Sequence, residues 1–373
     1  MDNKQIAEIL VRMADTMLFA KGERLATLPA LSTEEWNDIL TFASQQGVLP
    51  IVMTLIASHK IADNATRKLM LRWYVSVIKN RQLCQLQLKT MRQIARLMAS
   101  EGIDIMFMKG AALARLYPNP EWRVFSDIDF YLYGMSEQGI DLMSRHGITN
   151  RDFPHHHTQA MLNGVLLENH YDFVERVNHR CNIPVDNALK TLADKEGKSV
   201  PATFLGDKIH NAYVMTPTMN AIFLMRHMSA HFVAETTPLR QLYDWALFLR
   251  QYSREVDWPL VTSVYEQSGM TRFAGIIQQV LRSYLDFECA DCPIVFGNAE
   301  DARRVWTGII HPPKPNPHRK YSMKYYLYEA KVFLSNRWKH GIVYPGESYA
   351  GLFFRFAWHK AAFWFKRKVM KKS

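Results

Sequence analysis

Two aspartates one residue apart lie within an apolar run, and this pattern constrains the fold more than any other part of the chain. The run spans Ser126–Leu132 and places Asp127 and Asp129 on either side of Ile128. Side chains alternate along an extended strand, so the two carboxylates would project from one face, roughly 7 Å apart at Cα, while the apolar residues face the core. Oxygen ligands on one face favour a hard cation, magnesium or manganese, although an Asp-x-Asp pair also occurs on solvated strands. The neighbouring segments decide between these alternatives.

The segment before this run predicts a strand, a glycine turn and a helix. Apolar residues from Ile103 to Met108 predict a buried strand, and Gly110 begins a helix-forming stretch that reaches Tyr117 before two prolines end it. Amide groups in the first turn of such a helix favour a phosphate, and glycine lets the phosphate approach the backbone. Lys109 would stand beside it as a positive charge. An ordinary connection with an exposed lysine is the alternative, and the aspartate pair downstream argues against it.

The two segments together carry a more specific resemblance. The residues concerned are Met108-Lys109-Gly110-Ala111-Ala112-Leu113, Leu116-Tyr117-Pro118, Arg123 and Ser126-Asp127-Ile128-Asp129. In these residues the chain resembles the uncharacterised bacterial nucleotidyltransferase family, which shares the DNA polymerase beta-like nucleotidyltransferase fold. The resemblance implies an α+β fold, in which a mixed sheet with flanking helices is joined by N-terminal and C-terminal helical regions. Many relatives have Gly-Ser where this chain has Gly110-Ala111, so phosphate binding is left to backbone amides, Lys109 and Arg123.

A further acidic strand follows. Residues 159–173 predict a β-hairpin, because an Asn-Gly pair between apolar strands is a strong two-residue turn signal. Glu168, His170 and Asp172 would then lie on one face. The family resemblance places an acidic residue and a histidine in this strand, so we expect Glu168 to be the third carboxylate and the candidate general base. Asp172 is the reserve, and His170 is expected to contribute to cofactor binding.

The resemblance and these residues imply a metal-dependent nucleotidyltransferase. Asp127 and Asp129 would hold one Mg²⁺ or Mn²⁺ ion on the phosphates of a nucleoside triphosphate, and a second ion shared with Glu168 would lower the pKa of an acceptor hydroxyl. Pyrophosphate would leave along Lys109 and Arg123. The acceptor is open: a small molecule, a sugar or lipid-linked intermediate, or a protein hydroxyl. The alternative function is a weakly active or non-catalytic protein of the same fold that acts as a peripheral-membrane or interaction module.

The pattern along the chain predicts four regions. Helical periodicity runs through residues 1–100, and a catalytic core of short strands and helices is expected at 101–185. A helical lobe is expected at 186–290. A basic, aromatic C-terminal region is expected at 291–373.

Two groups of histidines have alternative roles. His227 and His231 lie four residues apart and share a helical face. Packing within the lobe is the expected role of this pair, and facing the nucleotide or acceptor together with Arg240 and Asp244 is the alternative. The run His155–His157 is expected to form a solvated turn, with phosphate contact as its alternative.

Positive charge is concentrated near the C-terminal end. Residues 319–373 hold thirteen Lys and Arg against Glu329 and Glu347, a net of +11 that equals the net charge of the whole chain. Aromatic residues are interspersed from Phe353 to Lys368, so this segment could lie on an anionic membrane surface, pack on the helical lobe, or bind nucleic acid. The neutral remainder of the chain argues against extended RNA or DNA as the acceptor.

Length and composition suit a folded protein in a reducing compartment. With 373 residues and 48% hydrophobic content, the chain can bury a substantial core. Its first residues lack the basic start and apolar core of a signal peptide, and no apolar run is long enough to span a membrane. We therefore expect a cytoplasmic protein, with attachment to the inner membrane through the basic segment as an option.

Overall fold

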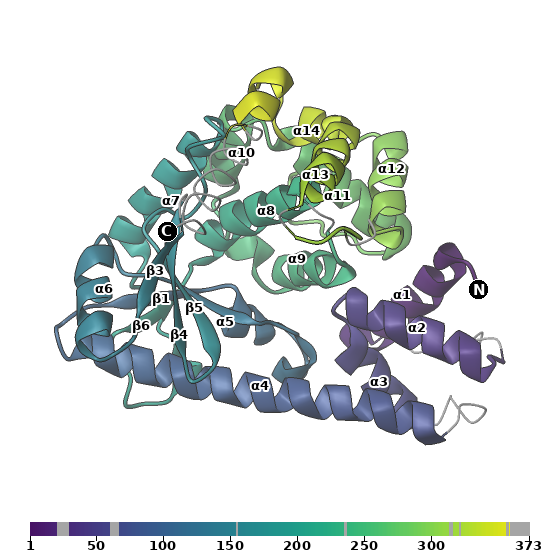
Figure 1. The fold of residues 1–373 in the computed structure, drawn as a ribbon, viewed down its shortest axis with the longest axis horizontal. Coiled ribbons are helices and arrows are strands. Elements are labelled where there is room, and N and C mark those ends of the chain that lie inside the picture. Colours follow the sequence, from purple (N-terminus) through teal and green to yellow (C-terminus); the bar gives the residue numbers. More distant parts are fainter. Residues whose placement is uncertain are drawn as a thin grey trace.

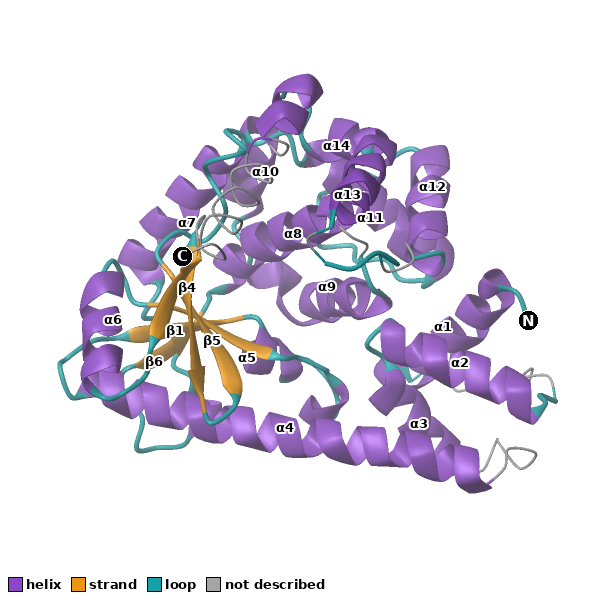
Figure 2. Cartoon of the chain, viewed as in Figure 1, coloured by secondary structure: helices purple, strands orange, loops and turns teal. Residues whose placement is uncertain are grey.

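Strands gather in one sheet, and helices make up most of the remainder, as Figure 1 and Figure 2 show. The computed structural model describes residues 1–20, 30–59, 67–153, 156–234, 237–312, 316–320, 322–355 and 358. The strands are β1 (Ile105–Met108), β2 (Asp127–Tyr131), β3 (Asn150–Phe153), β4 (His157–Leu162), β5 (Val165–His170) and β6 (Ala212–Val214). They form a six-stranded sheet in the order β3-β4-β5-β2-β1-β6. β1 pairs with β6 and β2 pairs with β5 in parallel, and the other neighbours are antiparallel, which confirms the predicted α+β fold with a mixed sheet.

Helices precede, interrupt and follow the sheet. The first group is α1 (Asn3–Phe19), α2 (Thr33–Gln45), α3 (Leu49–His59) and α4 (Arg67–Ala99). The second group is α5 (Gly110–Ala114), α6 (Ser136–Arg145) and α7 (Asn182–Glu196). The third group is α8 (Pro217–Ala234), α9 (Leu239–Tyr252), α10 (Trp258–Gln267), α11 (Thr271–Tyr284), α12 (Ala299–Ile310), α13 (Met323–Ser335) and α14 (Arg337–Val343). In Figure 1, α4 runs under the sheet and continues to α1–α3, while the third group forms a helical lobe on the other side.

The first strand and helix are both shorter than predicted. The predicted strand begins at Ile103, but the Ile103 amide donates to the Met98 carbonyl in the turn that ends α4. The predicted helix reaches Tyr117, whereas α5 ends at Ala114 because the amides of Leu116 and Tyr117 each donate to the residue three positions before. Such i to i+3 bonds tighten the last turn of a helix.

Alternating side chains divide the sheet between two cores. Phe107, Ile128 and Phe130 are buried in one core with residues of α4 and α6. Met106 and Tyr131 point the other way, into a larger core shared with the helical lobe and α1–α3. Since Asp129 lies between Ile128 and Phe130 in β2, its side chain faces the helical lobe.

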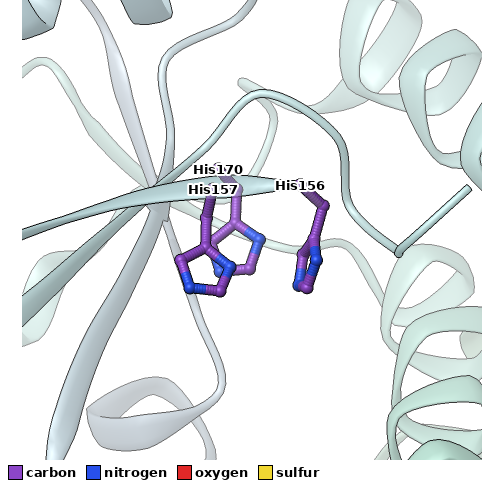
Figure 3. Close-up of side chains that lie close together, drawn as sticks. All are labelled: His156, His157 and His170. Atoms are coloured by element: carbon purple, nitrogen blue, oxygen red, sulfur yellow. The ribbon is translucent and has the colours of Figure 1, made fainter. Parts of the chain in front are cut away.

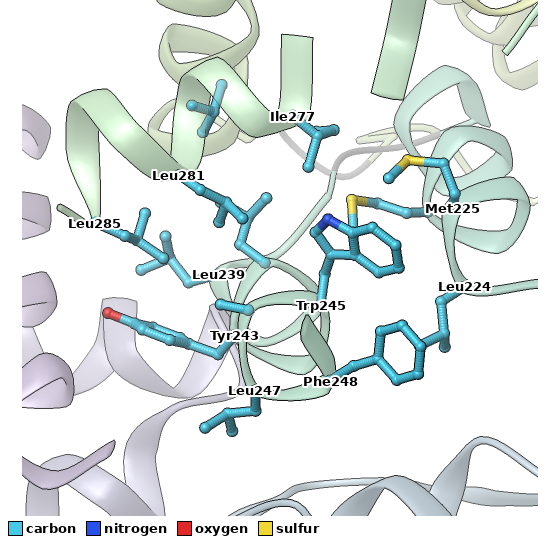
Figure 4. Close-up of a cluster of buried hydrophobic side chains, with 14 of the residues drawn as sticks. Leu224, Met225, Leu239, Tyr243, Trp245, Leu247, Phe248, Ile277, Leu281 and Leu285 are labelled. Atoms are coloured by element: carbon cyan, nitrogen blue, oxygen red, sulfur yellow. The ribbon is translucent and has the colours of Figure 1, made fainter. Parts of the chain in front are cut away.

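The larger core ties the N-terminal helices to the lobe. Trp245 and Phe248 of α9 lie in one buried cluster with Leu224 of α8 and Leu281 of α11, as Figure 4 shows. The hydroxyl of Tyr243, also in α9, donates to Asp15 Oδ1 of α1 at 3.0 Å. The N-terminal helices and the lobe therefore share one core, although the region boundaries drawn from sequence stay a prediction.

Most of the basic, aromatic segment predicted at 353–368 lies outside the described residues. Its described part is residues 353–355, at the end of a short helical stretch after α14, and residue 358, with Phe354 and Trp358 exposed. Within the described ranges, no helix has both the length and the apolar character needed to cross a bilayer.

Candidate active site

The turn between β1 and α5 has an unusual backbone. Lys109 has a φ of 49° and a ψ of −135°, and Gly110 has a φ of 37°. A lysine rarely adopts positive φ because its Cβ then crowds the backbone, and such strain is concentrated at functional sites. Ala111, the next residue, is buried within α5. The turn holds Lys109 Nζ 2.9 Å from Asp129 Oδ1, so the lysine pairs with a predicted metal ligand.

Parallel pairing of β2 and β5 brings a carboxylate and a histidine to Asp129. Asp129 is the Cα partner of Glu168, and His170 follows two residues further along β5. One ligand atom from each of these three residues lies within 4.8 Å of the other two, close enough to hold a single metal ion. Asp127 is half-buried and lines the same pocket, but it is outside this trio. The reserve carboxylate, Asp172, forms an ion pair with Lys190 instead.

Asp129 is buried as an ionised carboxylate. Only 2% of the residue is exposed to solvent. Burial alone would raise the pKa of Asp129, but Lys109 and His170 hold that pKa well below its ordinary value. The His170 Nε2 atom lies 3.1 Å from Asp129 Oδ1, on the oxygen that Lys109 also contacts. The negative charge of Asp129 is therefore balanced by the protein itself.

Glu168 has the opposite tendency. Burial, followed by the nearby charge of Asp129, raises the pKa of Glu168 above its ordinary value. Gln159 Nε2 donates a hydrogen bond to Glu168 Oε1 at 2.8 Å and fixes the carboxylate from the neighbouring strand β4. Two adjacent carboxylates with pKa values pushed apart are typical of acid–base chemistry. This arrangement suits Glu168 to accept a proton.

Two further histidines, His156 and His157, cluster with His170 of this trio. Figure 3 shows the imidazole rings of His156, His157 and His170 on the same side of the chain, and a ring nitrogen of each lies within 4.8 Å of the others. The prediction of a solvated turn is wrong for His157, which is buried because it begins β4 and is the Cα partner of His170. His156 is half-buried, and His155 lies outside the described residues.

Arg123, predicted to bind phosphate, lines the pocket and forms three hydrogen bonds within the protein. It is 3% exposed, and its Nε and Nη2 atoms donate to the two carboxylate oxygens of Asp244 at 2.8 and 2.9 Å. Its Nη1 atom donates to the Gly110 carbonyl at 3.1 Å. Tyr117 also donates to Asp244, at 2.8 Å. These bonds anchor the Lys109–Gly110 turn to α9.

All the predicted site residues except Ala111 line one pocket of about 520 Å³, a volume in the range usual for small-ligand sites. Its walls include the turn after β1, the facing ends of β2 and β5, and one face of α8. Arg240, which begins α9 together with Leu239, also lines it and makes a 3.3 Å contact with Asp244.

The α8 histidines belong to this pocket. His227 and His231 both line it, and the His227 ring also stacks on Phe223 with 5.8 Å between the ring centroids, so the pair packs within the lobe as expected, and contact with a nucleotide or acceptor stays a prediction. Burial, followed by the charge of Lys109, lowers the pKa of His227 well below its ordinary value and that of His231 to about 4. Both imidazoles are therefore neutral at pH 7, and neither adds positive charge to the pocket.

Further pocket residues were not predicted from the sequence. They are His179, Asn182, Arg226 and Tyr344, toward the N-terminus of α7; Gln159, which is outside the pocket lining but bonds to Glu168, was not predicted either. They come from four separate segments and carry no shared motif, so no local pattern could have grouped them.

A mixed sheet that presents an Asp-x-Asp strand beside a parallel strand with a third carboxylate defines the nucleotidyltransferase fold. The sequence profile described as "Uncharacterised nucleotidyltransferase" matches residues 32–286, and the chain belongs to this family. Among curated proteins, none matches the chain. Family membership confirms the resemblance and supports nucleotidyl transfer as the general activity.

Proposed function

We propose that this protein transfers a nucleoside monophosphate from a nucleoside triphosphate to an acceptor hydroxyl and releases pyrophosphate, with the help of a divalent metal ion. The observation that carries the proposal is the trio of Asp129, Glu168 and His170 on adjacent strands of a nucleotidyltransferase fold. Phosphoryl transfer depends on positioning and charge neutralisation more than on a covalent nucleophile, so a site without a nucleophilic triad is suited to it.

The donor set fits a divalent ion. Two carboxylates and one imidazole favour Mn²⁺ over Mg²⁺, since Mg²⁺ prefers oxygen ligands alone. When bound, such an ion would neutralise phosphate charge and lower the pKa of the acceptor hydroxyl. Asp127, on the same face of β2, would supply a carboxylate for a second ion.

Glu168 is the proposed proton acceptor. It lines the pocket beside Asp129, and Gln159 holds it in place. As the acceptor oxygen bonds to the α-phosphorus, its proton would pass to Glu168, and the bond to the leaving pyrophosphate would break.

Positive charge for the phosphates would come from Lys109 and Arg240. Both line the pocket, and both are bonded to aspartates of the protein. Lys109 would exchange Asp129 for phosphate oxygens when Asp129 turns to metal binding. Arg123 is saturated by Asp244 and Gly110, so we assign it to holding the turn rather than to touching phosphate.

The test is a labelling experiment. The full chain is incubated with ATP, GTP, CTP or UTP labelled on the α-phosphate, with MnCl₂ or MgCl₂ and a cell extract. We expect label to pass to one class of acceptor in a metal-dependent way, and to stop in Asp129→Asn. The control is Asp141→Asn, which changes an exposed aspartate of α6 and should label as the parent does.

Calorimetry measures the binding of the metal and the triphosphates directly. Metal and one of the four triphosphates should bind the parent protein and bind the Asp127→Ala, Asp129→Ala double variant at least tenfold more weakly. If no triphosphate binds the intact protein, or if the double variant binds equally well, the proposed function is rejected.

A further inference from the structure

The pocket has a second end that the proposed chemistry does not use. We call it the α7 end, formed by His179, Asn182, Arg226 and Tyr344, to separate it from the carboxylate end formed by Lys109, Asp129, Glu168 and His170. Arg226 projects from α8 and is only 1% exposed. None of its three guanidinium nitrogens has a hydrogen-bond partner in the part of the chain that the structure describes.

Aromatic packing holds the guanidinium in place but provides no hydrogen-bond acceptor for its N–H groups. Its central carbon lies 4.5 Å from the centroid of the Tyr344 ring, and the His179 ring stacks on Tyr344 at 3.7 Å with an interplanar angle of 3°. A cation–π contact fixes the orientation of an arginine. It leaves the N–H groups, which lie in the guanidinium plane, available for other partners. The Oδ1 atom of Asn182, on the same wall, is also buried and without a hydrogen-bond partner within the described ranges.

The acidic side chains of this end bond to groups other than Arg226. Glu347 accepts from the Cys181 amide at 3.2 Å and pairs with His179 Nδ1 at 2.9 Å. Burial would raise the pKa of Glu347, but these bonds hold it at about 2. Glu175 accepts from the Asn178 amide at 2.7 Å. Neither carboxylate lies within ion-pair distance of the guanidinium among the contacts of the described residues.

A buried guanidinium without hydrogen bonds is costly, because arginine stays protonated and its N–H groups lose water. Its planar fork matches a carboxylate or phosphate, which can accept two bonds at once. We propose that Arg226 binds an oxyanion group, carboxylate or phosphate, of the acceptor substrate. Asn182 Oδ1 would accept a hydrogen bond from a hydroxyl or amine of the same molecule. The acceptor is thus an acid that also carries the reacting hydroxyl, an assignment that rests on the proposed function.

Position in the pocket separates this role from triphosphate binding. Lys109 pairs with Asp129 and Arg240 with Asp244, so the cations available to the triphosphate lie at the carboxylate end. Arg226 lies against Tyr344 at the α7 end. In phosphoryl transfer the attacking and leaving oxygens lie on opposite sides of the phosphorus, so an acceptor site away from the phosphate-binding cations is required.

Thermal unfolding of the full chain tests the oxyanion site with defined probes. Inorganic phosphate and acetate are compared with sodium chloride at equal ionic strength, for the parent protein and for Arg226→Met. We expect one or both anions to raise the Tm of the parent by about 1 to 3 °C at concentrations well above their Kd, and Arg226→Met to lose at least half of that rise. Arg254→Met, which changes an exposed arginine, should keep the full rise.

The pattern across the anions identifies the source. A rise with acetate alone indicates a carboxylate on the acceptor, and a rise with phosphate alone indicates a phosphate. If neither anion stabilises the parent protein, or if Arg226→Met keeps the full rise, the oxyanion site is rejected. The oxyanion site is also rejected if the anion-induced rise in Tm is lost in Lys109→Met but kept in Arg226→Met.

Two further measurements separate the alternatives. Arg226→Lys keeps the charge but not the fork, so it should fold as the parent does and bind the anion at least tenfold more weakly, even if Arg226→Met misfolds. Binding of manganese and ATP should persist in Arg226→Lys, and its loss would make Arg226 a triphosphate ligand and overturn the acceptor assignment. If no triphosphate binds the parent protein, the proposed function fails while the anion result still decides whether Arg226 binds an oxyanion.

Discussion

Each end of the pocket buries a charged side chain. Only at the carboxylate end does this side chain have ion-pair or hydrogen-bond partners within the described part of the protein. At the carboxylate end, Asp129 is met by Lys109 Nζ at 2.9 Å and by His170 Nε2 at 3.1 Å. At the α7 end, Arg226 is equally buried, and its nitrogens have no hydrogen-bond partner among the described residues. The protein therefore balances the charge of Asp129 with its own side chains. The charge of Arg226 is left available to a ligand.

This difference indicates how each end would respond to its ligand. At the carboxylate end a ligand must compete with an existing ion pair, so binding of a cation and binding of phosphate are linked through Lys109. At the α7 end an anion would displace no hydrogen-bond partner of Arg226 among the described residues and would satisfy its free N–H groups. On the proposed function, the first arrangement would favour ordered assembly of metal and triphosphate, and the second would favour selection of an acidic acceptor.

The largest effect is expected at Asp129. Asp129→Asn should lower the initial rate of label transfer about 1,000-fold or more, because it removes the carboxylate common to the metal trio and the Lys109 pair. Asp127→Asn should lower the rate less, since Asp127 lies outside the trio. If Asp127→Asn lowers the rate as much as Asp129→Asn or more, the metal is held mainly by Asp127. The description of the carboxylate end would then be wrong.

A second prediction compares the two cations directly. In ligand-free protein, Lys109→Met should lower the free energy of unfolding by about 3 kcal/mol, because Asp129 loses its main partner in a buried site. Arg226→Met should have no cost or should stabilise the protein by about 1 kcal/mol, because it replaces a buried charge that has no hydrogen bonds with an apolar side chain.

Urea unfolding in chloride buffer measures both variants. Lys198→Met is the control, since Lys198 forms an ion pair with Asp104 at a largely exposed position and should contribute less than about 1 kcal/mol. Similar losses in Lys109→Met and Arg226→Met would show that Arg226 has a stabilising role in the free protein, and the contrast between the ends would disappear.

Sequence reasoning was most successful where the signal is local. The Asn-Gly pair predicted the hairpin of β4 and β5, and Asn163 and Gly164 both have the positive φ that a tight two-residue turn requires. Strand alternation predicted that Ile128 and Phe130 face a core opposite the aspartates. These features depend on residues a few positions apart, so periodicity and turn chemistry reveal them.

The charge balance of the site could not be predicted in this way. Arg123 and Asp244 are separated by 121 positions, and the sequence offers no sign that they pair. The positive charge of Arg123 suggested phosphate binding, but its partners depend on how α9 packs against the turn after β1. The sequence also does not reveal that Arg226 lacks hydrogen-bond partners among the described residues, because this depends on the bonds of every neighbouring side chain.

The smallest expected effect tests whether Glu347 is a hidden partner of Arg226. Glu347→Gln should lower the free energy of unfolding by about 1 to 2 kcal/mol at pH 7, since it weakens the bonds to His179 and to the Cys181 amide. The pKa of Glu347 in the folded protein, about 2, lies below its ordinary value of 4.5. Its contribution is therefore complete above pH 4.5 and fades as pH falls toward 2, so parent and variant should converge in acid.

Urea unfolding at several pH values, combined with a double-mutant cycle, measures this contribution. If Arg226 takes nothing from Glu347, the cost of Glu347→Gln should be the same within about 0.5 kcal/mol in the parent and in Arg226→Met. Glu101→Gln, which changes an exposed pair with Arg145, should cost less than about 0.5 kcal/mol. A coupling above about 1.5 kcal/mol would mean that Glu347 neutralises Arg226 in solution. The α7 end would then resemble the carboxylate end, and an anionic acceptor would have to displace Glu347 from Arg226, as phosphate would have to displace Asp129 from Lys109.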